Sequence, residues 1–221
     1  MPTQRRLPHI YPDDYWLFIT WHLYGSLPGS HFPPARKLSY GEAFAWVDRY
    51  LDGAHTGPLY LRSEAIATLV IESLLRGQNL GQYHLGPFVI MANHVHVLLL
   101  PSISPSVLLK SLKGATAREA NRLLHRTGGQ FWQRESYDHW VRDDREWSKI
   151  ASYIERNPVK AGLVSRAEDY LWSSANPRWS EGVHTSVNAA RKSACATDSG
   201  PNSKNLSRSL GSRRRETRIL A

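Results

Sequence analysis

Two histidines separated by one residue are the first residues of this sequence whose types and spacing could do chemistry. His94 and His96 lie in the apolar run FVIMANHVHVLLLP, residues 88–101. Side chains on a β-strand alternate between its faces, so the two imidazoles share one face, with Cα atoms about 6 to 7 Å apart, while Val95 and Val97 enter the core. Imidazole is the commonest metal ligand in proteins, and two ligands on a rigid strand leave coordination positions for substrate. The pattern predicts either part of a metal site or an ordinary polar strand face.

A tyrosine in the segment DDREWSKIASYIERNP, residues 143–158, is the second candidate. Tyr153 lies at the rim of the apolar stripe of a predicted helix, and Asn157 lies one turn further along the same side. A hydroxyl nucleophile and an amide oxygen are thus placed together. The alternative is a boundary tyrosine that packs its ring and exposes its hydroxyl. We predict that this helix begins near Asp143 and ends at about Asn157, because Pro158 disfavours helical geometry in the residue before it.

Apolar periodicity and turn residues predict the elements that must position these side chains. The aromatic run at 15–24 is typical of a strand, and residues 31–61 read as a long excursion with a short helix at 41–51. A helix follows Ser63 and continues until Gly77. We then expect two strands within 83–100, broken at Gly86-Pro87 or at Ala92-Asn93, a helix over 104–126, and a short strand followed by a loop within 131–141. This order predicts an α+β fold, with an antiparallel sheet covered by helices.

The composition narrows the class of partner. The chain has 221 residues, a formal net charge of +9 and a pI of about 9.8. It shows neither a transmembrane span nor a secretory signal, so the basic charge favours nucleic acid over a membrane surface. The single cysteine, Cys195, rules out an internal disulfide and any multi-cysteine zinc site. We expect a reducing, cytoplasmic setting.

The composition changes near residue 180, which divides the chain into a folded domain, 1–180, and a tail, 181–221. The tail has eight Lys and Arg against three acidic residues, and therefore carries +5 of the net charge. Such a segment buries too little apolar surface to offset its ordering entropy, so we predict a disordered basic tail. It is either a solvated extension or a nonspecific clamp on phosphates.

Basic and aromatic side chains on and around the two later helices are candidates for holding DNA. The aromatic candidates could stack on unpaired bases. For the two tryptophans among them core packing is the favoured role. The basic residues either contact phosphates or form a solvated surface. The basic candidates are Lys110, Lys113, Arg118, Arg122, Arg126, Arg134, Arg142, Arg145 and Lys149, and the aromatic ones, with one histidine, are Trp132, Tyr137, His139 and Trp140.

Three motifs in order, ANHVHVLLLP, FWQRESYDHWVRD and YIERNPVKAGLV, resemble the REP-associated tyrosine transposases. These are relatives of the insertion-sequence transposases that act on single-stranded DNA through a His-hydrophobic-His motif. The resemblance covers about residues 16–175. It implies a ferredoxin-like antiparallel sheet with flanking helices. It also implies that His94 and His96 bind a metal ion, that Tyr153 is the nucleophile, and that Asn157 completes the metal site.

The resemblance also implies a reaction. A DNA strand is cleaved and rejoined through a 5′-phosphotyrosine intermediate, at hairpin repeat elements, with Mg²⁺ or Mn²⁺ as cofactor. Two imidazoles and an amide oxygen would form a neutral ligand set, so the ion keeps its full charge for the phosphate. We expect single-stranded or hairpin DNA as partner and a monomer or homodimer. Two alternatives stay open: a catalytically silent DNA-binding regulator of the same fold, and a metal-dependent hydrolase that uses water.

Overall fold

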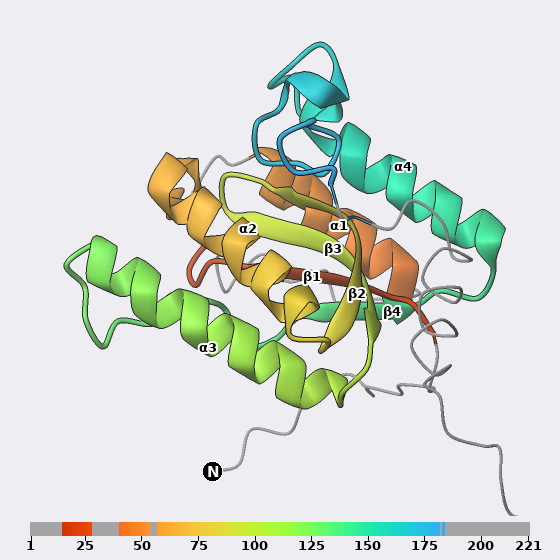
Figure 1. Cartoon of the computed structure of the whole chain (residues 1–221). Coiled ribbons are helices and arrows are strands. Elements are labelled where there is room, and N and C mark those ends of the chain that lie inside the picture. Colours follow the sequence, from red (N-terminus) through yellow and green to blue (C-terminus); the bar gives the residue numbers. More distant parts are fainter. Residues whose placement is uncertain (1–14, 28–39, 54–56, 182, 184–221) are drawn as a thin grey trace, which may run out of the picture.

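The structure is a computed structural model that describes residues 15–27, 40–53, 57–181 and 183. The predicted tail therefore lies outside the described residues, apart from Glu181 and Val183. The elements follow in the order β1 (Leu17–His22), α1 (Tyr40–Gly53), η1 (Tyr60–Arg62), α2 (Glu64–Asn79), β2 (Tyr83–Ile90), β3 (His94–Pro101), α3 (Pro105–Leu123), β4 (Tyr137–Trp140), α4 (Asp144–Lys160) and η2 (Ala167–Asp169) (Figure 1).

The four strands form one antiparallel sheet in the order β2-β3-β1-β4. The register of β1 against β3 runs from Leu17 opposite Leu99 to His22 opposite His94. With α2 between β1 and β2, and α3 between β3 and β4, the core has the βαββαβ order of the ferredoxin-like fold. The predicted α+β class is confirmed. Helix α1 is an insertion between β1 and α2, and α4 follows the last strand.

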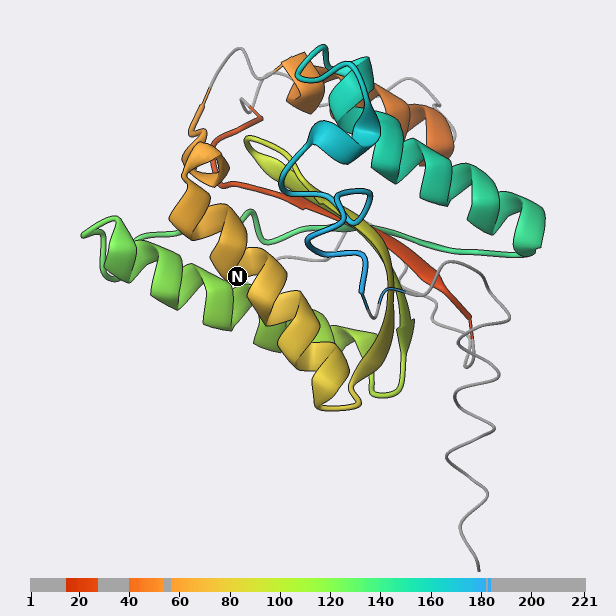
Figure 2. The same ribbon diagram turned by 45° about the horizontal axis from the view of Figure 1, so that its top comes forward.

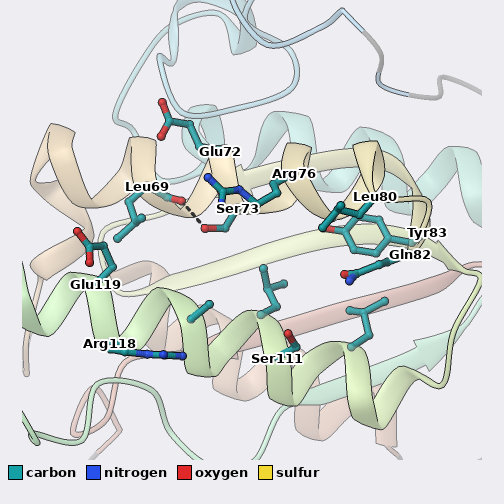
Figure 3. Close-up of a pocket in the computed structure, with 14 residues that line it drawn as sticks. Leu69, Glu72, Ser73, Arg76, Leu80, Gln82, Tyr83, Ser111, Arg118 and Glu119 are labelled. Atoms are coloured by element: carbon teal, nitrogen blue, oxygen red, sulfur yellow. Dashed lines mark hydrogen bonds between the residues drawn. The ribbon is translucent and has the colours of Figure 1, made fainter.

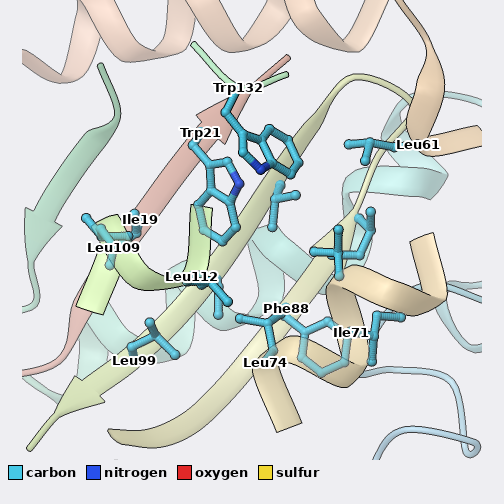
Figure 4. Close-up of a cluster of buried hydrophobic side chains, with 14 of the residues drawn as sticks. Ile19, Trp21, Leu61, Ile71, Leu74, Phe88, Leu99, Leu109, Leu112 and Trp132 are labelled. Atoms are coloured by element: carbon cyan, nitrogen blue, oxygen red, sulfur yellow. The ribbon is translucent and has the colours of Figure 1, made fainter. Parts of the chain in front are cut away.

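Helices cover both faces of this sheet, with α2 and α3 on one side and α1 and α4 on the other (Figure 2). The cluster on the α2–α3 side includes Trp21, Leu74 and Phe88 (Figure 4). The cluster on the α1–α4 side includes Trp16, Phe18, Leu98, Trp147 and Ile154. Strand β3 is consequently buried on both faces from His94 to Leu100. The helices on the second side therefore shield its histidines from water.

Two helices run past the ends predicted from their sequence. Helix α4 includes Pro158 and ends at Lys160, since a proline in the last turn removes only one helical hydrogen bond. The turn closes behind it, where the Leu163 amide donates to the Pro158 carbonyl at 2.9 Å. Helix α2 continues through Gly77 and ends at Asn79. A Cβ at position 77 would overlap the Tyr83 ring, which explains why this residue is a glycine. Close packing, and not a helix stop, accounts for this glycine.

The remaining differences concern extended segments. Both candidate breaks within 83–100 occur: the ladder shifts register between Leu85 and Phe88, and a turn at 91–93 separates β2 from β3. Within 131–141 the predicted order is wrong. The strand β4 comes last, and Trp132 makes only an isolated bridge to Leu23. Among the described residues, each helix is too short or too polar to cross a bilayer.

Candidate metal and tyrosine site

Strand β3 and helix α1 bring together three side chains that could hold a metal ion. Asp48, His94 and His96 each offer a ligand atom, and these atoms all lie within 4.8 Å of one another. The imidazole rings of His94 and His96 are 4.6 Å apart between centroids, on the sheet face that α1 and α4 cover. All three side chains are buried. The cluster lies within the structure and not on a half-exposed strand face.

Hydrogen bonds at Nδ1 orient the two imidazoles. The Thr20 hydroxyl lies 2.7 Å from Nδ1 of His96, and the Asn93 amide oxygen lies 2.7 Å from Nδ1 of His94. Asn93 is itself held, because its Nδ2 donates to the Leu51 carbonyl at 3.1 Å. Partners of this kind fix the ring orientation of metal-binding histidines. Nε2 is therefore the ligand atom that each ring turns toward α1.

Two carboxylates of α1 face these Nε2 atoms. Asp48 Oδ1 lies 3.1 Å from Nε2 of His96, and Asp52 Oδ1 lies 3.6 Å from Nε2 of His94. All four atoms are buried, and apart from these facing contacts none of them has a hydrogen-bond partner within the described part of the chain. The second oxygen of each carboxylate faces Lys160, whose Nζ lies 2.9 Å from Asp52 Oδ2 and 3.7 Å from Asp48 Oδ2. Unpaired buried polar atoms are costly, so a cation between them fits the cluster.

The pKa shifts of the histidine and the two carboxylates agree with binding of a cation. Burial, together with the neighbouring His96, holds the pKa of His94 well below its usual value, so its imidazole is neutral and able to bind a metal. Burial alone would raise the pKa of Asp48, but contact with His96 and His94 and the Tyr153 hydroxyl holds it below the ordinary range. Burial and the charge of Asp48 raise the pKa of Asp52. Asp48 is the carboxylate that stays ionised.

Tyr153 reaches this cluster from α4. Its hydroxyl donates a hydrogen bond to Oδ2 of Asp48, and Nδ2 of Asn157 donates to the same hydroxyl at 3.5 Å. The amide oxygen of Asn157 is buried and has no partner among the described residues. Burial and then the negative charge of Asp48 raise the pKa of Tyr153 well above its usual value near 10. The tyrosine is held as a protonated donor.

Asp48 is the residue of this cluster that sequence reasoning missed. It lies in the 31–61 excursion, in a segment without a recognisable motif. The available signal was the pair Asp48 and Asp52, which are four residues apart and hence on one side of a helix. The carboxylate also changes the expected chemistry: the cluster is not a neutral set of two imidazoles and an amide. Asn157 as a metal ligand stays a prediction.

The predicted DNA-binding residues divide between the two faces of the sheet. On the side of Tyr153, Arg142 and Lys149 are exposed and line a cavity next to the tyrosine. A second groove, of about 390 Å³, is lined by Lys149, Tyr153, Arg156 and Lys160. The last two cations were not predicted. Arg134 and Arg145 are exposed, and neither of them lines the cavity or the groove next to Tyr153.

The predicted cations of α3 lie on the opposite face. Arg118 lines a groove of about 580 Å³ between α2 and α3, and Arg76, Glu72 and Glu119 line the same groove (Figure 3). Arg122 donates to Glu119 at 2.9 Å. Lys113 donates to the carbonyls of Gln133 and Arg134 at 2.7 and 3.0 Å, which ties α3 to the following loop. Lys110 is exposed on the same helix, and Arg126 contacts the hydroxyl and ring of Tyr60. These residues lie across the sheet from Tyr153.

The aromatic candidates also separate. Trp132 is a core residue, and its indole N–H donates to Thr116 at 2.9 Å. Core packing is wrong for Trp140, which is 37% exposed. It lies near the sheet edge on β4, where Tyr15 and Arg142 contact its ring. Tyr137 and His139 are partly buried and line the cavity beside Tyr153.

Comparisons with known proteins agree with this geometry. Residues 63–157 match the family described as IS200-like transposases. A Haemophilus influenzae protein described as a REP-associated tyrosine transposase is 32% identical over 97 residues, which are 38% of this chain and 54% of that protein. The match thus spans about half the length of that relative.

The solved structure of a REP-associated tyrosine transposase bound to a REP hairpin superposes with a TM-score of 0.53. That match covers 82% of this chain and 88% of the other, at 15% identity, and shows a common fold. Across residues 63–157 this chain therefore matches the IS200-like transposases, and the resemblance to REP-associated tyrosine transposases that its motifs indicated is confirmed.

Proposed function

We propose that this protein is a metal-dependent transposase that cleaves and rejoins single-stranded DNA through a 5′-phosphotyrosine at Tyr153. The observation that carries the proposal is the hydrogen bond from the Tyr153 hydroxyl to Asp48, which joins a nucleophile to the buried cluster with His94 and His96. The family match supports DNA cleavage. The related structure that holds a REP hairpin supports hairpin DNA as the partner.

Asp48, His94 and His96 would hold the divalent cation, and the unpaired amide oxygen of Asn157 is a further donor nearby. Oxygen ligands suit Mg²⁺ and Mn²⁺ alike, whereas imidazole is better tolerated by Mn²⁺. A bound cation would neutralise the charge that develops on the phosphate oxygens. The charge of Asp48 lowers the net charge of the site, which favours release of an anionic product.

The side chains of the site suggest how the proton and the bonds move. Asp48 Oδ2 accepts a hydrogen bond from the Tyr153 hydroxyl and is therefore placed to take the hydroxyl proton. The tyrosine oxygen then bonds to phosphorus, the bond from phosphorus to the 3′ oxygen breaks, and that oxygen leaves as a hydroxyl with the proton that Asp48 took from Tyr153. The Lys160 ammonium, 5.4 Å from the centre of the Tyr153 ring, stabilises negative charge there. Attack by another 3′-hydroxyl reverses the step without ATP.

The test uses a labelled single-stranded oligonucleotide that carries hairpins from the DNA flanking the gene, with Mn²⁺ or Mg²⁺. We expect a denaturation-resistant protein–DNA adduct that requires the metal and is lost in Tyr153→Phe. Cleavage that persists in Tyr153→Phe, without any adduct, would identify a hydrolase that uses water. Binding without cleavage in either metal would identify a silent DNA-binding regulator.

With one proposed nucleophile in each chain, strand exchange needs either two subunits or two successive rounds at one subunit. A monomer or homodimer therefore stays the prediction, as does the cytoplasmic setting. Size-exclusion chromatography with light scattering, with and without the hairpin oligonucleotide, measures the number of chains in each particle.

A further inference from the structure

A cavity of about 480 Å³ lies beside Tyr153, between the first turns of α1, strand β4 and helix α4. Helical spacing explains its position. On α1, Phe44 lies one turn before Asp48, and on α4, Lys149 lies one turn before Tyr153. Phe44 and Lys149 line the cavity. Asp48 and Tyr153, one turn further along their helices, form the hydrogen bond at the cluster with His94 and His96. The cavity and the cluster are adjacent, with Tyr153 between them.

Aromatic rings form the walls of this cavity. The rings of Phe44 and Tyr137 lie 4.2 Å apart between centroids at 31°. Phe18 meets Tyr137 edge-on at 5.9 Å, and Tyr153 meets Phe44 edge-on at 6.2 Å. Phe44 and Tyr137 are only partly buried, although they pack against the hydrophobic cluster on the α1–α4 side of the sheet. Flat aromatic surfaces that remain accessible beside a reactive group suit a planar ligand.

The rim of the cavity is positively charged. Arg142 and Lys149 line it and are exposed. The acid on the rim, Glu146, is already engaged, because the His139 Nε2 atom lies 2.9 Å from one oxygen and the Arg142 amide donates to the other at 2.8 Å. The aromatic walls suit a base, and the cations suit the phosphates on either side of it. A cavity of this volume is large enough for one base.

We propose that this cavity is a subsite for one unpaired base of the DNA strand, next to the phosphate that Tyr153 attacks. The inference rests on the proposed function, since it names how that site holds its substrate. A base stacked in the cavity places its own phosphate at the mouth, within reach of both Tyr153 and Lys149. The subsite therefore sets which phosphate is cleaved.

The first experiment measures binding with the chemistry switched off. The full chain with Tyr153→Phe, which keeps the ring, is titrated with the hairpin oligonucleotide by fluorescence anisotropy. Each unpaired nucleotide is replaced in turn by an abasic residue. We expect one position at which the loss of the base weakens binding by roughly 5- to 100-fold, the usual size of a stacking contact.

A cavity-filling variant shows whether that base lies in this cavity. Gly41 lines the cavity, and a Cβ there meets nothing within 4 Å among the described residues, so Gly41→Phe has room to add a ring at the cavity wall. Gly114 is the matched control, because it is also a helical glycine whose Cβ would meet nothing within 4 Å, on α3 across the sheet. We expect Gly41→Phe to weaken binding of the intact strand, but not of the strand abasic at the sensitive position. Gly114→Phe should bind both as the parent does.

Two results would overturn the subsite. One is that no single base matters to binding, which includes the absence of any binding. The other is that Gly41→Phe weakens intact and abasic strands alike. The adduct assay with the unmodified chain separates this failure from failure of the proposed function. A base effect without an adduct keeps the subsite and rejects the nucleophile. An adduct without a base effect keeps the nucleophile and rejects the subsite.

Discussion

At the scale of single residues, one carboxylate links the proposed nucleophile to the histidines. Asp48 turns Oδ2 to the Tyr153 hydroxyl and Oδ1 to Nε2 of His96. The same side chain therefore influences both metal binding and the proton of the tyrosine. Substitutions at this cluster are expected to change metal affinity and adduct formation together.

Asp48→Asn keeps the shape of the side chain but removes its charge. We expect Mn²⁺ affinity to fall by at least about 10- to 100-fold, the range seen even for partners of metal ligands. Isothermal titration calorimetry measures it. Asp169→Asn, the same chemical change at an exposed position of η2, serves as control. An unchanged Mn²⁺ affinity in Asp48→Asn would show that this carboxylate is no ligand.

His96→Ala removes a ligand atom from the buried strand. We expect metal-dependent cleavage to be abolished while the protein still unfolds cooperatively, because the sheet and both apolar clusters remain. Gel analysis of cleavage and thermal denaturation give the two readings. Normal cleavage by this variant in the presence of a chelator would reject a role for metal.

His22 gives a pH dependence to stability. Burial lowers its pKa from 6.5 to about 4, so between these values the unfolded chain binds a proton that the folded chain does not. The free energy of unfolding should therefore fall as the pH is lowered through this window, by at most about 3 kcal/mol from this group. Urea denaturation at pH 7.5 and 4.5, with chelator present, measures the fall. His22→Gln should reduce it, whereas His125→Asn, at an exposed position, should not.

At the scale of elements, two helices on one face of the sheet carry most of the site. Helix α1 supplies Asp48 and Asp52, and α4 supplies Tyr153, Asn157 and Lys160. Helix α4 is positioned at its start by Asp143, whose carboxylate accepts the Glu146 amide at 2.7 Å. The N-cap that stabilises the start of α4 therefore lies about three turns before Tyr153.

Removal of that cap measures its contribution to the stability of α4. Asp143→Ala should lower the free energy of unfolding by about 1 kcal/mol, the usual cost of losing an N-cap. Asp144→Ala, which also removes a negative charge from the start of the helix but no cap, should cost less. Urea denaturation compares the two variants. Equal effects would mean that charge alone, and not the cap, stabilises the start of α4.

At the scale of the whole molecule, positive charge is distributed over both faces and the C-terminal segment. Core packing continues to the end of the described residues, because Trp179 is buried and Val183 packs against the hydrophobic cluster on the α2–α3 side. The domain boundary near residue 180 stays a prediction. Residues 184–221 carry eight Lys and Arg and two acidic residues. Their role in DNA binding is best tested by truncation after Val183, which leaves the core intact.

Truncation after Val183 should weaken binding of single-stranded DNA and make its salt dependence shallower, because fewer cations contact phosphates. Adduct formation at saturating DNA should be retained. Anisotropy titrations over a series of salt concentrations measure the slope. Complete loss of the adduct would show that the C-terminal segment contributes to the chemistry.

Local patterns in the sequence predicted most of the elements and one half of the site. Strand alternation brings His94 and His96 to one face, and helical spacing places Asn157 one turn from Tyr153, since both relations depend only on neighbours along the chain. The antiparallel α+β class follows from the order of such elements. The helix ends predicted at about Asn157 and at Gly77 were wrong. Helix α4 continues through Pro158 because a proline in the last turn removes only one helical hydrogen bond, and α2 continues through Gly77, which is a glycine because it packs against the Tyr83 ring.

Which carboxylate contacts the histidines depends on packing between segments that are distant in sequence. Asp48 and His94 are distant in sequence, and the packing of an inserted helix over the sheet brings them together. The same packing decided that the histidines are buried and that Arg118 lies across the sheet from Tyr153. Contacts of this kind depend on which face of the sheet each helix covers, and that depends on burial of the whole apolar surface and not on any local pattern.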